Sequence, residues 1–144
     1  MSANDTQVGG DHYRKGNADF QHWDLVEVFG LGYLEGCATK YLTRWRDKNG
    51  LQDLQKAKHY SQKLLELART GERKPRGFVP AAPIENFLRD NSITDESERG
   101  AIYILCRWKT YQDIELAIGC IQQVIESQPG TPEDGGHHAR QQED

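Results

Sequence analysis

The stretch ATKYLTRWR at residues 38–46 recurs as AIYILCRWK at residues 101–109. The segment that follows, QDLQKAKHYSQKLLE at 52–66, recurs as QDIELAIGCIQQVIE at 112–126, and the first copy carries three extra residues at the turn. In each segment the apolar residues recur every three to four positions, which is the period of an amphipathic helix. The repeat therefore predicts two helical hairpins related by pseudo-twofold symmetry. A chance match between short amphipathic helices is the alternative.

The patterns around the repeat set the limits of the hairpins. We expect the first hairpin at residues 34–69 and the second at 95–127, joined by a linker at 70–83 that is rich in Pro and Gly. No segment alternates between apolar and polar residues for the length of a strand. The sequence thus predicts an all-α protein, in which residues 1–128 form a single small helical bundle.

The two ends of the chain are expected to lie outside the bundle. The first 18 residues are rich in polar residues and Gly, which predicts an irregular N-terminal loop. Residues 129–144 are polar and lack an apolar pattern, which predicts a disordered tail. We expect His137 and His138 in this tail to be solvated rather than to bind a metal.

Composition narrows the class of protein. Of the 144 residues, 36% are hydrophobic and the mean hydropathy is -0.81. Such a small apolar fraction favours self-association, so we expect a homodimer. No apolar run is long enough to span a membrane, and the N-terminus lacks a secretory signal, which predicts a cytoplasmic protein.

Side chains of two kinds are expected in the core. The three cysteines lack the spacing of a metal site, which predicts reduced thiols and no zinc. The three large indole rings are also expected to be buried. These residues are Cys37, Cys106, Cys120, Trp23, Trp45 and Trp108.

Positive charge is concentrated in one part of the chain. Residues 38–76 hold eleven Lys and Arg against four Asp and Glu, whereas the remaining residues hold seven against eighteen. An acidic protein with one basic segment is not suited to coating a nucleic acid, and it is better suited to a local anionic ligand. Charge complementarity across a self-interface is the other interpretation.

Residues shared by the two copies point to a structural role. Arg44 and Arg107 both precede a Trp at the end of a helix. A guanidinium can pair with a carboxylate through two hydrogen bonds, so we expect these residues to bridge to Asp53 and Asp113.

Residues found only in the first copy are the candidates for function. At the matching positions of the second copy, these residues are replaced by an aromatic, an apolar or a glycine residue, and one has no counterpart. An exposed helical face would explain the same residues. They are Lys40, Lys48, Lys56 and His59.

Several spaced motifs resemble those of a known family. They are Gly9-Gly10-Asp11-His12-Tyr13, Lys40-Tyr41-x-x-Arg44, Lys48-Asn49-Gly50 and Asp53-Leu54-x-Lys56-Ala57-x-x-Tyr60. In this order they resemble a family of small bacteriophage proteins, mostly of unknown function, to which a phage kinase of deoxynucleoside monophosphates is related. The resemblance covers about residues 8–66. It implies a phage protein, acting in the host cytoplasm, that binds a nucleotide and phosphorylates it.

These motif residues could form a phosphate-binding site. The chain has no GxxxxGK[ST] motif, so it is not a P-loop kinase. Asp53 could orient Arg44 or hold Mg²⁺, the ion that phosphoryl transfer usually requires. The remaining residues could neutralise or contact a phosphate, and one ring could stack on a base. They are His12, Tyr13, Lys40, Arg44, Lys48 and Lys56.

Three function classes remain open on the sequence. The first is a nucleotide kinase or another phosphate-transfer enzyme, and the second is a non-catalytic protein that sequesters a nucleotide. The third is a protein or nucleic-acid interaction module that uses the basic hairpin. A helical pyrophosphohydrolase is a minor fourth class, because Asp24-x-x-Glu27 and Asp95-x-x-Glu98 are poor matches to its metal-binding pairs.

Overall fold

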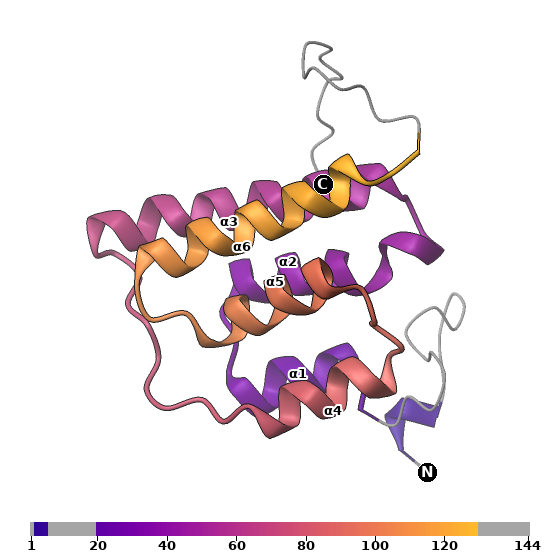
Figure 1. Ribbon diagram of the computed structural model, residues 1–144. Helices are drawn as coiled ribbons and strands as arrows, with labels where there is room; N and C mark the ends of the chain where they lie inside the picture. Colours follow the sequence, from indigo (N-terminus) through magenta and orange to yellow (C-terminus); the bar gives the residue numbers. More distant parts are fainter. Residues whose placement is uncertain (1, 6–19, 130–144) are drawn as a thin grey trace.

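The computed structural model describes residues 2–5 and 20–129 (Figure 1). These residues form α-helices and short 3₁₀ turns and contain no strand, which confirms the all-α prediction. None of the described helices is long and apolar enough to cross a membrane. The α-helices are α1 (His22–Phe29), α2 (Tyr33–Arg44), α3 (Leu51–Thr70), α4 (Ala82–Asp90), α5 (Glu96–Arg107) and α6 (Tyr111–Glu126), and the 3₁₀ turns are η1 (Ala3–Asp5) and η2 (Trp45–Asp47).

The helices pack as three pairs, and each pair takes one helix from each half of the chain. Figure 1 shows α3 beside α6, α2 beside α5 and α1 beside α4, and the three pairs are in contact. The predicted hairpins are α2–α3 and α5–α6, which also pack within themselves. The repeat is therefore larger than the sequence indicated: each half is a unit of three helices, α1–α3 and α4–α6.

The first helices of the two halves end in the same backbone motif. Gly30 and Ser92 both have φ of 58°, the left-handed conformation that closes many helices. In each case the next residue donates its N–H to a carbonyl of the last helical turn. The pairs are Leu31 to Val26 at 3.1 Å and Ile93 to Leu88 at 2.9 Å. This shared ending supports the three-helix repeat, although the two helices share little sequence.

The turn between α2 and α3 contains a 3₁₀ segment and a glycine with a positive φ. The helix α2 ends at Arg44, and the chain continues as the turn η2. Gly50 has φ of 58° and precedes α3 as its N-cap. The three extra residues of the first copy are accommodated in this turn.

The core lies between the helix pairs and includes two of the three tryptophans. Trp45 and Trp108 are buried, as predicted. The prediction for Trp23 was wrong: it is 49% exposed, and its indole N–H donates to Asn4 Oδ1 at 2.7 Å. The short helix α1 buries the face that carries Leu25 and Phe29, and Trp23 lies off that face.

The three cysteines are free thiols, as expected. Cys37 and Cys106 are buried, and Cys120 is half-buried. Burial raises the pKa of the Cys106 thiol to about 12. These residues therefore act as small core side chains.

The linker between the halves is anchored by arginines. Arg76 donates from its guanidinium to the carbonyls of Phe29, at the end of α1, and Cys106, in the last turn of α5. Arg73 forms an ion pair with Glu35 of α2. A cation at a helix C-terminus satisfies free carbonyls and interacts favourably with the helix dipole. The linker thus contributes to packing between the halves.

Candidate functional site

Three of the predicted phosphate-binding residues gather around one buried aromatic ring. The Nζ atoms of Lys40 and Lys56 lie 4.7 Å and 5.4 Å from the centroid of the Tyr41 ring. The guanidinium carbon of Arg44 lies 4.7 Å from the same centroid. A cation this close to a ring is attracted by the electrons of the ring face. Three positive charges therefore lie close together around the Tyr41 ring.

Two further tyrosines connect this ring to the surface. Tyr60 stacks on Tyr41 with centroids 5.8 Å apart and an interplanar angle of 26°. Tyr33 meets Tyr60 edge-on at 5.9 Å and 71°, and Tyr33 itself is 71% exposed. The three rings and three cations form what we call the tyrosine–lysine cluster: Tyr33, Lys40, Tyr41, Arg44, Lys56 and Tyr60.

Helix geometry brings the cluster together. Residues three or four positions apart lie on one helical face, so α2 places Lys40 and Arg44 one turn apart on the same edge, next to Tyr41. By the same rule, α3 places Lys56 and Tyr60 one turn apart. Because α2 and α3 form a hairpin, these two pairs face each other across it.

Arg44 is fixed by a buried ion pair. Its Nε lies 3.2 Å from Asp53 Oδ2, and a terminal nitrogen lies 3.4 Å from Oδ1. Asp53 is fully buried and also accepts from the backbone N–H and the side-chain amide of Asn49, both at 3.4 Å. Of the two roles predicted for Asp53, this geometry is that of a residue that orients Arg44.

Metal binding by Asp53 stays a prediction. Both of its oxygens accept hydrogen bonds from Arg44 and Asn49. Within residues 2–5 and 20–129, no three His, Cys, Asp or Glu side chains are grouped so that they could hold a metal ion. A Mg²⁺ ion at Asp53 would have to compete with the Arg44 guanidinium.

A buried histidine lies close to the cluster. His22 Nε2 is 2.8 Å from Thr39 Oγ1, and Thr39 donates its hydroxyl to the carbonyl of Glu35 at 2.8 Å. Because that hydroxyl hydrogen is engaged, the imidazole donates from Nε2. Burial, helped by the charge of Lys40, lowers the pKa of His22 to about 4. The histidine is therefore neutral at pH 7 and adds no charge to the cluster.

The other predicted site residues are not joined to the cluster. His12 and Tyr13 lie outside the described residues. Lys48 is exposed in the turn after η2, and no interaction shown among the described residues connects it to the Tyr41 ring. His59 is exposed on α3. Their assignment as phosphate-binding residues, or for His59 as a functional candidate, stays a prediction.

The shared role expected for the two arginines was only half right. Arg44 pairs with Asp53, but Arg107 donates from Nε to the carbonyl of Val79 at 2.9 Å. Asp113 accepts instead from the backbone N–H groups of Lys109 and Thr110, at 2.8 Å and 3.1 Å. The shorter turn of the second half brings these amides to Asp113, and the linker offers Arg107 a carbonyl.

The tyrosines of the cluster were not among the site residues predicted from the sequence. Tyr41 and Tyr60 appeared only within the family motifs, and Tyr33 was given no role. Their spacing carried a signal, because Tyr33 and Tyr41 are two helical turns apart and therefore share a face with each other. An exposed tyrosine on the same face as a buried one indicates an aromatic path to the surface.

The comparisons with known proteins cover the half that contains this cluster. Residues 9–62 match the model of a family described as proteins of unknown function, DUF3310. The matched range includes α1, α2 and most of α3, with every residue of the tyrosine–lysine cluster. The resemblance to a family of unknown function is thus confirmed over these residues. No curated protein and no solved structure matches the chain.

Proposed function

We propose that this protein binds a nucleotide at the tyrosine–lysine cluster. The observation that carries the proposal is the convergence of Lys40, Arg44 and Lys56 on the Tyr41 ring, at 4.7 to 5.4 Å from its centroid. Cations that crowd one ring repel one another, and an anion placed among them relieves that repulsion. A phosphate is an anion that can accept hydrogen bonds from several of them at once.

The phosphate end of the ligand is assigned to Lys40 and Lys56. Arg44 is held by Asp53 in a buried ion pair. Arg44 therefore contributes a fixed positive field, while the flexible lysine side chains can close on a phosphate. A hydrogen bond to a charged group contributes about 1.5–3 kcal/mol.

The base end of the ligand is assigned to Tyr33. This ring is 71% exposed, and Tyr60 supports it from one edge. Stacking of a base on an aromatic side chain contributes about 1–3 kcal/mol, and it is tolerant of the identity of the base. A nucleotide lying along the rings would place its base at Tyr33 and its phosphate at Lys40 and Lys56.

The geometry supports binding more directly than turnover. Phosphoryl transfer usually requires Mg²⁺ held by a carboxylate, and Asp53, the carboxylate that contacts Arg44 of the cluster, is engaged in that ion pair. A kinase activity, as the motif resemblance implies, would draw its metal ligands from elsewhere or from the nucleotide phosphates. Sequestration of a nucleotide needs only the contacts described above.

Calorimetric titration with deoxynucleoside monophosphates tests the proposal. Lys40→Ala and Lys56→Ala should each weaken binding by about tenfold to a hundredfold, since about 1.4 kcal/mol corresponds to a factor of ten. Lys63→Ala is the matched control, because Lys63 is an exposed lysine of α3 that pairs with Glu66. Absence of binding to the parent protein, or equal affinities for all three variants, would overturn the proposal.

A second measurement separates binding from turnover. The protein is incubated with ATP, Mg²⁺ and each deoxynucleoside monophosphate, and the diphosphate is measured by chromatography. Accumulation of diphosphate that is lost in Lys40→Ala would establish a kinase at this cluster. Binding without diphosphate would establish a sequestering protein.

A further inference from the structure

One face of the α5–α6 hairpin carries uncharged residues where the equivalent face of α2–α3 carries lysines. In the repeat, Tyr103 stands where the first half has Lys40, and Leu116 stands where it has Lys56. The same fold thus presents a cationic face on one half and an uncharged face on the other. We call the second one the α5–α6 face: Gly100, Tyr103, Ile104, Leu116, Gly119 and Cys120.

The residues of the α5–α6 face are neighbours on the surface. Gly100, Tyr103 and Ile104 line a single hollow. A Cβ atom built on Gly100 would lie 3.5 Å from Cys120 Sγ, so α5 and α6 meet at this point. Leu116 precedes Cys120 by one turn of α6, and residues four positions apart share a helical face. The face therefore continues from the hollow to Leu116.

Leu116 projects from this face into solvent. It is 63% exposed, although the replacement of lysine by leucine is typical of a position that becomes buried. A single exposed leucine is common on protein surfaces, but this one adjoins other uncharged residues and an apolar hollow. Removing its side chain from water is favourable, and within one chain that gain is not made.

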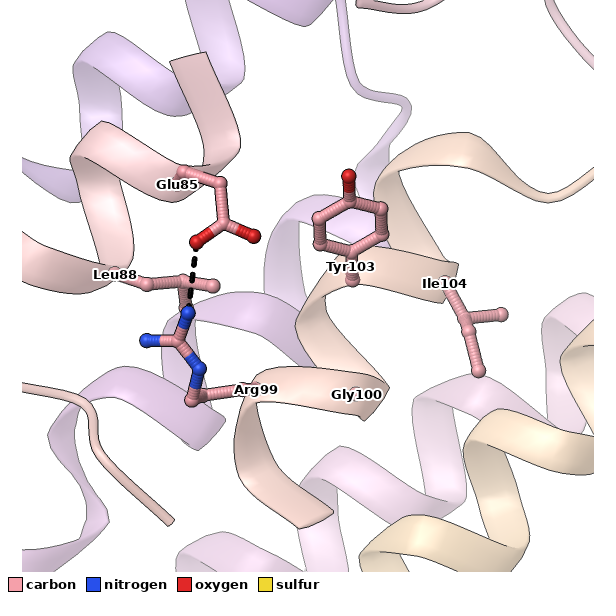
Figure 2. A pocket seen from close by; sticks show the side chains of 6 residues that line it. All are labelled: Glu85, Leu88, Arg99, Gly100, Tyr103 and Ile104. Carbon is pink, nitrogen blue, oxygen red and sulfur yellow. Dashed lines mark hydrogen bonds and ion pairs between the residues drawn. The ribbon is translucent and has the colours of Figure 1, made fainter. Parts of the chain in front are cut away.

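The hollow beside Leu116 is a place where side chains became smaller. It has a volume of about 290 Å³, and Gly100 and Ile104 stand where the first half has Cys37 and Tyr41. An apolar cavity of about 150 Å³ already admits benzene, so the hollow has room for a leucine side chain. Figure 2 shows its lining: Glu85, Leu88, Arg99, Gly100, Tyr103 and Ile104.

The charged groups at this face already have partners within the chain. Arg99 donates to Glu85 Oε1 at 2.7 Å, as the dashed line in Figure 2 marks, so the lining of the hollow has no net charge. Arg107 donates to the carbonyl of Val79, and its guanidinium lies over the Tyr103 ring. A twofold contact places a surface against a copy of itself, so unbalanced cations would repel each other there. This face avoids that repulsion, whereas the tyrosine–lysine cluster does not.

We propose that the α5–α6 face is a self-association surface, through which two copies of the chain form a dimer with twofold symmetry. Leu116 of each copy fills the hollow beside Gly100 and Ile104 of the other, so a single contact is made twice. A projecting apolar side chain and a hollow of sufficient size on the same face make that face complementary to itself. The tyrosine–lysine cluster belongs to the other half of the chain and is not part of the contact.

The mass of the full-length protein in solution is the first test. Multi-angle light scattering across micromolar concentrations should give twice the 16.4 kDa of one chain. A monomer mass at every concentration would overturn the proposal. Masses that grow beyond the dimer would also overturn it, because a reciprocal contact closes at two copies.

A lysine substitution tests whether Leu116 lies in the contact. Leu116→Lys introduces the residue that the first half carries at this place, so the fold accepts it, and circular dichroism checks this. It should raise the dissociation constant of the dimer at least a hundredfold, because like charges in an interface cost several kilocalories per mole. Val28→Lys is the matched control, since Val28 is a 54% exposed apolar residue of α1. A dimer that survives Leu116→Lys, or that Val28→Lys disrupts equally, would contradict the location.

A pair of size changes tests the fit of Leu116 in the hollow. Gly100→Leu fills the hollow and Leu116→Ala shortens the projecting side chain, and each should weaken the dimer at least tenfold in analytical ultracentrifugation. A leucine within α5 favours the helix, so Gly100→Leu should fold. In the double variant, the leucine at position 100 takes the volume that Leu116 vacated. The double variant should therefore lose much less affinity than the product of the two single losses. Losses that simply multiply would show that Leu116 does not occupy the hollow.

Discussion

Glu35 and Glu98 occupy equivalent positions in the two halves, and each accepts a hydrogen bond from the tryptophan of the other half. Trp45 Nε1 lies 3.3 Å from Glu98 Oε1, and Trp108 Nε1 lies 3.0 Å from Glu35 Oε2. Both carboxylates are 1% exposed. Such an exchange of equivalent contacts is what a twofold axis produces. It shows that the pseudo-symmetry extends from the backbone to the buried polar groups.

Each of these carboxylates also has an arginine partner, but the two partners come from different places. Arg46 forms an ion pair with Glu98 from the opposite half, and it lies over the Trp45 ring at 4.3 Å. Glu35 pairs with Arg73 from the linker between the halves. The second half has Lys109 where the first has Arg46, and Lys109 donates to carbonyls of the linker instead. An arginine thus balances the charge of each buried carboxylate, but Arg46 and Arg73 are not at equivalent positions of the repeat.

The Glu98 contacts predict a large loss of stability on truncation. Glu98→Ala should lower the free energy of unfolding by about 1–3 kcal/mol, because it leaves the buried indole N–H of Trp45 without its acceptor, whereas the half-exposed Arg46 can be hydrated. Denaturant unfolding followed by circular dichroism measures the change. Glu115→Ala is the control, because its ion pair with Arg69 is exposed and such pairs contribute about 0–1 kcal/mol. Similar losses for the two variants would show that the link between the halves is not stabilising.

The Arg44–Asp53 pair predicts that Arg44 differs from the lysines beside it. Arg44→Ala should cost about 3–5 kcal/mol of stability, because it leaves the buried Asp53 carboxylate without its cation. Adding Asp53→Asn in the same chain should recover part of that loss, since it removes the buried charge. Lys40→Ala should stay within about 1 kcal/mol of the parent. Thermal and chemical unfolding of the three variants checks the order, and an equal cost for Arg44→Ala and Lys40→Ala would contradict it.

The fold could be predicted from the sequence where two copies of a pattern agree. The repeat identified α2–α3 and α5–α6, but not the symmetry between α1 and α4. Those two helices are short and share a backbone ending rather than side chains. A glycine such as Gly30 indicates a left-handed conformation in the sequence, whereas a serine such as Ser92 does not. Trp23 was misplaced for a related reason. Spacing predicts the faces of a helix, but a helix as short as α1 needs to bury only one of them.

The candidate site was predictable within one helix and less so between helices. The positions of Lys40 and Arg44 on the same edge follow from helical geometry alone. The approach of Lys56 depends on the register between α2 and α3, which the turn at η2 decides. The hydrogen-bond partner of Arg107 was not predicted, because that partner is a backbone carbonyl of the linker, at Val79. Every residue has a backbone carbonyl, so the sequence does not indicate which carbonyl a side chain such as Arg107 will contact.

The left-handed residue at the end of α4 predicts a stabilising substitution. Ser92 has φ of 58°, a conformation that costs about 1–2 kcal/mol for residues other than glycine. Ser92→Gly should therefore raise the free energy of unfolding by about 1 kcal/mol, and the melting temperature should rise with it. Gly30→Ala, at the equivalent position of α1, should lower stability by a similar amount. Scanning calorimetry of both variants checks the opposite signs, and a loss of stability in Ser92→Gly would refute the argument.

The buried histidine predicts how stability depends on pH. The pKa of His22 is lowered from 6.5 to about 4 in the folded protein, by burial first and by the charge of Lys40 second. Below pH 6.5 the unfolded chain binds a proton at this position and the folded chain does not, so the stability contributed by neutral His22 falls as the pH drops from about 6.5 to about 4. The loss is at most about 3.5 kcal/mol, since one pKa unit corresponds to about 1.4 kcal/mol. Chemical unfolding at pH 7.5 and pH 4.5 measures it, and His22→Gln, which keeps a donor for Thr39, should show a smaller difference between the two pH values. All other titratable groups are the same in the two proteins, so the difference between parent and variant isolates the histidine. Parallel pH profiles for the two proteins would show that His22 does not contribute to acid sensitivity.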